Sequence, residues 1–310
     1  MKPFRFGVNT RGADTRAGLA ERARKVEAQG YSTLLVPDHL ADLFPPLLPL
    51  VTVAEATTSL RVGTFVLNND FRHPVLLARE AATVDLLSDG RLELGIGAGH
   101  MQSEYEQAGL PFDPAPVRFE RLGESVQILK SMLEGKTTTF DGRHYQVREH
   151  KPFPLPRQQP RPPILIGGNG RKLLSLAARE ADIVGLTGLA FPKGATVVDV
   201  SGFKPAAVDE RVAWLRAEAG SRYESLELNV LVQRVIPTDN RRQTAEELAA
   251  NWPALAAEDV LQTPYLLIGT VDEMAESLRL RRERWGISYV VTHEPYQDAL
   301  APVVAKLAGE

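Results

Sequence analysis

Short apolar, β-branched runs alternate along the chain with longer segments whose apolar positions recur at helical spacing. The runs predict eight strands: Phe4–Asn9, Thr33–Val36, Leu60–Leu67, Arg91–Ile96, Ile164–Ile166, Asp182–Leu186, Leu226–Val235 and Ile287–Thr292. The longer segments predict helices: Thr15–Gln29, Leu47–Thr57, Pro74–Leu87, Arg118–Leu133, Arg171–Glu180, Val208–Ala219, Thr244–Leu261 with an interruption at Pro253, Thr270–Arg284 and Asp298–Leu307. The predicted helix Thr270–Arg284 begins with Thr270 as a candidate N-cap, and Glu273 follows three residues later.

About eight strands, most of them followed by a helix, predict the α/β class and a (β/α)8 TIM barrel. We expect a single domain over residues 1–310. A doubly wound sheet is the competing fold, but its first βα turn is usually rich in glycine, whereas Thr10–Asp14 has one. Pro152–Pro163 holds six prolines and is interpreted as a surface connection. Thr187–Ala206, after the sixth strand, is interpreted as an extended loop that acts as a lid.

Composition and charge exclude several function classes. The formal net charge of −3 gives no electrostatic support for binding nucleic acid. The absence of cysteine excludes disulfides, thiolate nucleophiles and zinc–thiolate sites. The N-terminus lacks the pattern of a signal peptide, and no apolar run approaches the roughly 20 residues that span a bilayer. We therefore expect a cytoplasmic protein without nucleic-acid or membrane partners.

In a barrel, chemistry lies where strands end and βα loops begin. Asp38-His39 follows the second predicted strand, and either a catalytic pair or a helix cap explains it equally well. Arg72-His73-Pro74 follows the third strand, where a purely structural turn explains most of the pattern. His293 follows the last strand but belongs to no motif.

Two glycine-rich strings also follow predicted strands. Gly97-Ala98-Gly99-His100, with Glu104 close behind, has more glycine than one tight turn needs, which favours contact with a ligand. Gly167-Gly168-Asn169-Gly170 opens a helix, where free N–H groups and the helix dipole favour an anion such as a phosphate. The spacing of His, Asp and Glu matches no metal site, and no serine lies in a nucleophile elbow.

In this order, the motifs resemble the bacterial luciferase-like flavin oxidoreductase superfamily over essentially the whole chain. The most specific stretches are Arg72–Asp85, Leu87–Arg91, Leu94–Gly97, Glu104, Arg118, Glu120, Glu124, Pro163–Gly168 and Ile268–Thr270. Asp38-His39 is similar to the pair found in the deazaflavin-dependent branch, which uses coenzyme F-420. The resemblance implies that His39 is the catalytic group beside the cofactor, and that Asp38 orients it.

The resemblance also implies the residues that bind the cofactor. A bulge on the third strand, with a non-proline cis peptide at Phe65-Val66, would support the ring. The two glycine strings would contact the ring, the ribityl chain and the phosphate. The implied cofactor-binding residues are Asp38, Phe65, Val66, Gly97, Ala98, Gly99, Glu104, Gly167, Gly168, Asn169 and Gly170. The branch that oxidises glucose 6-phosphate has a Trp within Leu40–Phe44, a Glu at His100 and a Lys near Ala190; none is present, which argues against that substrate.

The leading hypothesis is hydride transfer between the deazaflavin and a small organic substrate. His39 would polarise the substrate or exchange a proton, and His100 would supply a second proton. The alternatives are an FMN-dependent monooxygenase on the same scaffold and a non-catalytic flavin-binding protein. A carboxylate-pair hydrolase would need two facing acids, and the sequence nominates none. The family often forms homodimers, so we expect one here.

Overall fold

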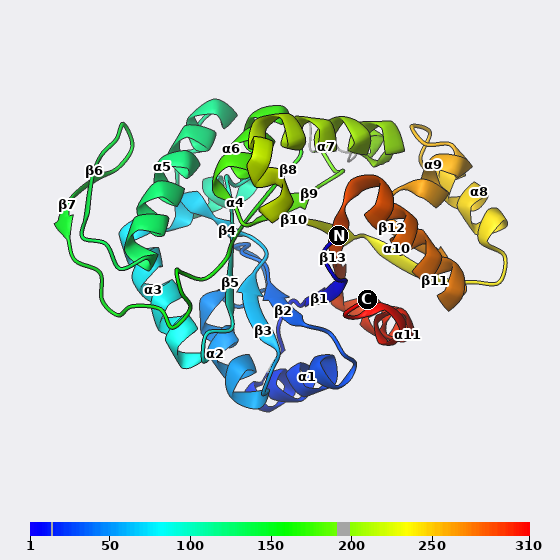
Figure 1. Cartoon of the computed structure of the whole chain (residues 1–310), viewed down its shortest axis with the longest axis horizontal. Helices are drawn as coiled ribbons and strands as arrows, with labels where there is room; N and C mark the ends of the chain where they lie inside the picture. Colours follow the sequence, from blue (N-terminus) through cyan, green and yellow to red (C-terminus); the bar gives the residue numbers. More distant parts are fainter. Residues whose placement is uncertain (14, 191–198) are drawn as a thin grey trace. The chain divides into compact units, whose positions relative to one another are not determined.

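The computed structural model describes residues 1–13, 15–190 and 199–310. These residues form two compact units. Unit 1 consists of Met1–Asn9, Val26–Ser32 and Gly167–Glu310, and unit 2 of Thr10–Lys25 and Thr33–Ile166. In each unit, parallel strands alternate with helices along the chain (Figure 1).

Unit 2 is built on parallel strands that are mostly buried and apolar, with Arg61 and Glu93 as charged exceptions. In hydrogen-bonded order these are β2 (Thr33–Val36), β3 (Arg61–Thr64), β5 (Leu92–Gly97) and the start of β8 (Ile164–Gly168), with the short β4 (Leu67–Asn68) also on β5. Its other elements are α1 (Arg16–Ala28), which continues into unit 1, α2 (Leu47–Ala56), η1 (Asn69–Phe71), α3 (Pro74–Leu87), α4 (Gln102–Ala108), α5 (Ala115–Leu133), and the antiparallel hairpin of β6 (Thr138–Asp141) and β7 (Gln146–His150).

Unit 1 carries a second set of parallel strands. In hydrogen-bonded order these are β1 (Arg5–Asn9), β13 (Ile287–His293), β10 (Glu227–Val232) and β9 (Ile183–Leu186). A separate parallel pair consists of β11 (Arg234–Pro237) and β12 (Leu266–Gly269). The helices are α6 (Arg171–Glu180), η2 (Ser201–Phe203), α7 (Pro205–Ala219), η3 (Gly220–Ser225), α8 (Arg241–Asn251), α9 (Ala257–Gln262), α10 (Val271–Trp285), η4 (Glu294–Tyr296) and α11 (Gln297–Leu307).

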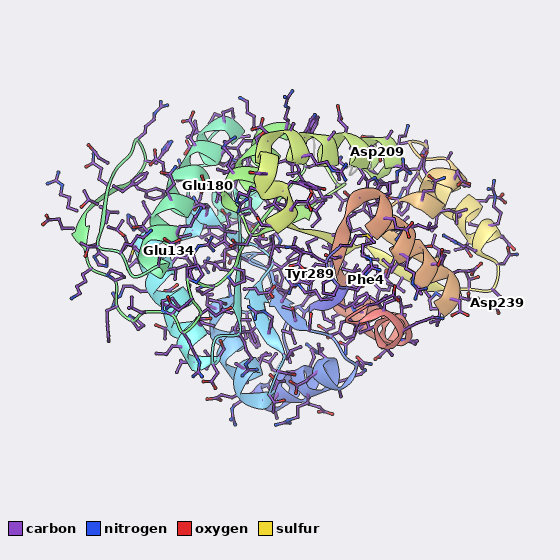
Figure 2. The ribbon with its side chains drawn as sticks, viewed as in Figure 1. Phe4, Glu134, Glu180, Asp209, Asp239 and Tyr289 are labelled. Carbon is purple, nitrogen blue, oxygen red and sulfur yellow. The ribbon has the colours of Figure 1, made fainter. Side chains whose placement is uncertain are left out.

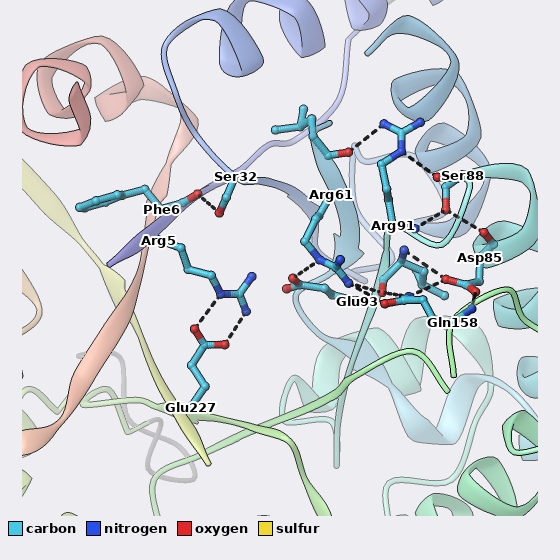
Figure 3. A network of polar contacts seen from close by, with 12 residues as sticks. Arg5, Phe6, Ser32, Arg61, Asp85, Ser88, Arg91, Glu93, Gln158 and Glu227 are labelled. Carbon is cyan, nitrogen blue, oxygen red and sulfur yellow. Dashed lines mark hydrogen bonds and ion pairs between the residues drawn. The ribbon is translucent and has the colours of Figure 1, made fainter. Parts of the chain in front are cut away.

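Unit 1 combines apolar packing with a partly buried ion pair between Arg5 and Glu227. Phe4 and Tyr289 are buried beside β1 and in β13 (Figure 2). The Arg5 guanidinium lies 3.6 Å from the centre of the Tyr289 ring and donates two hydrogen bonds, of 2.7 and 2.6 Å, to Glu227 (Figure 3). This two-point geometry aligns β1 with β10, on either side of β13.

A buried polar network in unit 2 fastens the proline-rich connection to the strands (Figure 3). Asp85, which is fully buried near the end of α3, accepts hydrogen bonds from the backbone N–H (2.9 Å) and side-chain amide (2.6 Å) of Gln158. Arg61 donates to both Gln158 and Glu93. The segment Pro152–Pro163 is therefore a fixed surface connection, and it contains two cis X-Pro bonds.

Several predicted boundaries need correction. Leu60–Leu67 is two strands, because the chain bulges at Phe65-Val66. Leu226–Val235 is also two strands, β10 and β11, and Thr244–Leu261 is two helices, α8 and α9, on either side of Pro253. The sequence analysis missed the β6–β7 hairpin, β12 and α4. Within the predicted loop Thr187–Ala206, residues 191–198 lie outside the described residues; Ala190 pairs with Asp199, and α7 begins at Pro205.

Candidate functional site

Residues that follow three neighbouring strands of unit 2 lie at one edge of its sheet. Asp38 and His39 follow β2, Asn68 ends β4, and His100 comes after β5. Because these strands are parallel, their carboxyl ends share that edge, which is where βα folds carry their ligands. The three residues that the sequence nominated as catalytic are therefore neighbours in space.

The His39 imidazole is held by a buried carboxylate. Its Nδ1 lies 2.9 Å from Oε1 of Glu104, on α4. The Glu104 side chain is 7% exposed, whereas that of His39 is 32% exposed. Since Glu104 engages Nδ1, Nε2 is the ring nitrogen that can meet a ligand.

A second imidazole adjoins the first. The rings of His39 and His100 meet edge to face, with their centres 5.7 Å apart and an interplanar angle of 86°. Partial removal from water lowers the pKa of His100 below its ordinary value, and the positive charges of His39 and Arg118 lower it further, while Glu104 opposes them. His100 therefore favours the neutral form beside a histidine that is paired with a carboxylate.

Asp38 has partners other than the one expected. Its Oδ2 accepts the backbone N–H of Asn68 (3.0 Å) and an N–H of Arg72 (2.5 Å), and its Oδ1 lies 3.4 Å from the second Arg72 nitrogen. Its side chain is only 4% exposed. The structure thus corrects the expectation that Asp38 orients His39, because Glu104 makes that hydrogen bond.

The predicted non-proline cis peptide is present at Phe65-Val66, between β3 and β4. The Phe65 N–H donates to the carbonyl of Val36 in β2 (2.9 Å). The Thr64 hydroxyl both accepts from the Gly95 N–H (2.9 Å) and donates to the Gly95 carbonyl (2.7 Å). This bulge is therefore fastened to a strand on each side.

Close packing accounts for the glycines of β5 and its turn. A Cβ at Gly95 would lie 2.0 Å from the Thr64 carbonyl oxygen, and one at Gly97 would lie 2.8 Å from the Val66 side chain. Gly99 has φ of +71°, and a Cβ there would lie 2.1 Å from the Tyr105 hydroxyl. The buried Arg118 donates to the carbonyls of Ala98 and Gly99 and fixes this turn. The abundance of glycine in this string is thus explained without a ligand.

The glycines before α6 behave differently. Among the described residues, a Cβ at Gly170 would meet nothing within 4 Å, and one at Gly167 only the Gly185 carbonyl oxygen at 3.8 Å, although Gly168 is packed against Leu173. Within the same part of the chain, the carbonyl oxygen of the Asn169 side chain is buried without a hydrogen-bond partner. Gly170 is the N-cap of α6 and supplies no side-chain cap, so the first N–H groups of α6 are uncapped. Open space and these N–H groups fit an anionic ligand, whereas the Asn169 oxygen could only accept from a donor such as a hydroxyl.

Comparison with known proteins identifies the family. The model of the luciferase-like monooxygenase family matches residues 2–254. The chain belongs to this family. A relative from Nakamurella multipartita, named F-420-dependent glucose-6-phosphate dehydrogenase, is 30% identical over 96% of this chain and 92% of its own length. A protein of the same name from Microbacterium testaceum is 31% identical, but that match spans 58% of this chain and 55% of the relative.

A solved structure confirms the predicted fold. The coenzyme F-420-dependent tetrahydromethanopterin reductase from Methanopyrus kandleri superposes with a TM-score of 0.78 and 16% identity, covering 99% of each chain. This luciferase-like protein therefore has the α/β class and the (β/α)8 TIM-barrel fold that the sequence predicted. Among the described residues, no helix combines the length and apolarity needed to cross a bilayer.

Three further side chains contribute to the luciferase-like site. The sequence analysis placed Arg72 in a turn without committing it to the site, and it nominated neither Asn68 nor Tyr105. Arg72 pairs with Asp38, and Asn68 and Tyr105 are hydrogen-bonded to each other (2.9 Å). Burial raises the pKa of Tyr105 to about 12, so its hydroxyl is a donor at neutral pH. The polar string Asn68-Asn69-Asp70 directly after a strand was the available signal. A pocket of about 330 Å³ lies beside this cluster, lined by Asp70, Phe71, Arg72, His73, Tyr105, Leu110, Pro111, Arg121 and Tyr145.

His293 lies at the end of β13 in unit 1. Its Nε2 is 3.4 Å from the side-chain oxygen of Gln233, and burial lowers its pKa. In the β1–β13 register it faces Asn9, whose side-chain oxygen is buried without a partner among the described residues. These groups end two neighbouring strands of the luciferase-like fold, but no motif assigns them a role.

Proposed function

We propose that this protein is an oxidoreductase that uses coenzyme F-420 to exchange a hydride with a small organic substrate. Two relatives named as F-420-dependent dehydrogenases support this function, one of them matched over almost its whole length. The observation that carries the proposal is the His39–Glu104 pair at the strand ends, because a partly exposed imidazole fixed by a buried carboxylate can move a proton. A protein that only stored a flavin would not need it.

Each unit, taken by itself, has residues that fit one part of the cofactor. In unit 2, the bulge Phe65-Val66 and the turn Gly97–Gly99 would hold the ring, and Glu104 would act there through His39. In unit 1, Gly167–Gly170 would hold the anionic tail, since Gly167 and Gly170 leave open space among the described residues and the first N–H groups of α6 are uncapped. When bound, the deazaflavin supplies a carbon, C5, that accepts or gives a hydride.

His39 is the proposed catalytic group. Glu104 holds its Nδ1, so Nε2 takes a proton from an alcohol as it is oxidised or gives one to a carbonyl as it is reduced. His100 lies beside His39, and its lowered pKa makes it a weak proton acceptor, so its proposed role is to supply a proton. Asp38 contributes to the site through its hydrogen bonds with Asn68 and Arg72.

The cofactor and the catalytic group can be tested separately. Purified protein is titrated with coenzyme F-420 and with FMN, and binding is followed by fluorescence. We expect micromolar affinity for F-420 and weak affinity for FMN; preference for FMN would instead favour a monooxygenase. His39→Ala should retain F-420 binding and lose turnover by about 100-fold or more, the usual contribution of a general acid–base. His150→Ala, on the β6–β7 hairpin, serves as the control and should leave both unchanged.

Other features of the proposal rest on the sequence and the family. The substrate is a small molecule other than glucose 6-phosphate, because the Trp, Glu and Lys expected for that sugar are replaced here. Residues 1–310 act as one domain, and the protein works in the cytoplasm as a homodimer without nucleic-acid or membrane partners. Substrate screening and light scattering of the purified protein test these points.

A further inference from the structure

The surroundings of Asp38 point to a role that differs from contact with a ligand. A side chain that touches a cofactor must present surface to it, and Asp38 is 4% exposed where its neighbour His39 is 32% exposed. Its Oδ2 is used twice, by the Asn68 N–H and by Arg72, and the second Arg72 nitrogen approaches Oδ1. The carboxylate is thus committed to protein partners.

Asn68 connects Asp38 to the end of the next strand. Its N–H reaches Asp38, and its side-chain oxygen accepts from the Asp70 N–H (3.1 Å) and the Tyr105 hydroxyl (2.9 Å). The same side chain lies against Gly99, where a Cβ would come within 2.6 Å of its oxygen. One buried residue thereby ties the loop after β2 to the turn after β5.

We propose that Asp38 and Arg72 are positioning residues: their ion pair clamps the backbone at Asn68 and so fixes the Phe65-Val66 bulge against the Gly97–Gly99 turn. This inference rests on the proposed function, in which those two segments hold the cofactor ring. Because a charged acceptor binds a backbone N–H about twice as strongly as a neutral one, the ion pair gives the clamp its strength. Asp38 therefore contributes to cofactor affinity without exchanging a proton in the reaction.

The first test needs no cofactor. Hydrogen–deuterium exchange of peptides covering residues 65–72 is compared in wild type, Asp38→Ala and Asp38→Asn, with Asp42→Asn as the control. Asp42 is an exposed carboxylate on the same loop. We expect faster exchange of this segment in Asp38→Ala, an intermediate rate in Asp38→Asn, which keeps an acceptor for the Asn68 N–H, and no change in the control. Wild-type exchange in Asp38→Ala would overturn the proposal.

The second test separates positioning from catalysis. Asp38→Ala should weaken F-420 binding by about tenfold or more, the factor for losing a charge-assisted hydrogen bond, and should leave the pH midpoint of turnover where wild type has it. Should Asp38→Ala leave Arg72 unpaired and the protein unfolded, Asp38→Asn/Arg72→Gln removes both charges together and is expected to recover most of the affinity. A displaced pH midpoint, or unchanged affinity, would overturn the inference. If wild type itself fails to bind F-420, the proposed function is wrong, and the exchange experiment still decides on the clamp.

Discussion

Replacing Gly95 and Gly170 by alanine, one at a time, tests whether protein packing or a ligand requires each glycine. At Gly95 the new methyl group would lie 2.0 Å from the Thr64 carbonyl oxygen, well inside van der Waals contact. The obstacle is backbone, which cannot rotate away, so β3 and β5 must separate. We expect the free energy of unfolding to fall by about 3 kcal/mol, the upper end of the cost of overpacking.

Gly170→Ala is the matched contrast to Gly95→Ala, because the space around Gly170 is open. Its φ of −90° and ψ of 152° suit any residue, and its methyl group would meet no atom of the described residues within 4 Å. The free energy of unfolding should therefore change by less than about 1 kcal/mol, because the freedom that the unfolded chain loses opposes the weaker preference of alanine for an N-cap. If the cofactor tail occupies that open space, the affinity for F-420 should fall instead.

Urea unfolding followed by circular dichroism measures both free energies, and fluorescence titration measures both affinities. The reasoning would be refuted if Gly95→Ala were as stable as wild type, since the packing explanation of β5 would then fail. It would also be refuted for Gly170 if alanine there destabilised the fold as much as alanine at Gly95. Unchanged F-420 affinity in a stable Gly170→Ala protein would show that the cofactor tail does not bind beside Gly170.

Three further predictions concern stability. Thr270→Ala removes the side chain that caps α10 in its reciprocal arrangement with Glu273, and should lower the free energy of unfolding by about 1 kcal/mol in urea titrations, with exposed Thr83→Ala unaffected. Asp85→Ala removes the acceptor of the Gln158 and Leu92 backbone N–H groups and one of the two acceptors of the Gln158 amide, and should cost about 2–3 kcal/mol in the same assay, with exposed Glu80→Ala on the same helix for comparison. Burial lowers the pKa of His293 below its ordinary value of 6.5. The contribution of the neutral imidazole to stability is therefore complete above pH 6.5 and is lost as the pH falls through the lowered value. The free energy of unfolding, measured above and below pH 6.5, should fall less in His293→Gln than in wild type.

The sequence predicted the elements that carry a strong periodic signal. α10 begins at the expected cap, Thr270, and β5 and β13 follow runs that are almost wholly apolar. It failed where two elements share one apolar run. Leu60–Leu67 looks continuous because the bulge at Phe65-Val66 is made of apolar residues and changes only the backbone. The hairpin β6–β7 was missed because its strands are largely exposed and carry no apolar alternation.

The candidate site was predictable in composition but not in pairing. Strand ends nominated Asp38, His39 and His100, because parallel strands bring their carboxyl ends together. Adjacency in sequence then favoured an Asp38–His39 contact, yet consecutive side chains at the end of a strand point to opposite faces. Asp38 accordingly meets Arg72 and Asn68, and His39 meets Glu104, which lies 65 residues further along.

The same logic separates the two glycine strings, which look equivalent in sequence. Glycine is required wherever a Cβ would collide, and a collision with protein leaves nothing for a ligand to explain. A Cβ at Gly95, Gly97 or Gly99 would collide with Thr64, Val66 or Tyr105, whereas one at Gly167 or Gly170 would come no nearer than 3.8 Å to any atom of the described residues. Small residues that protein packing does not require are the stronger indication of a ligand. The open space at the start of α6 therefore supports the proposed site for an anionic group, while the glycines of β5 serve the packing of the bulge.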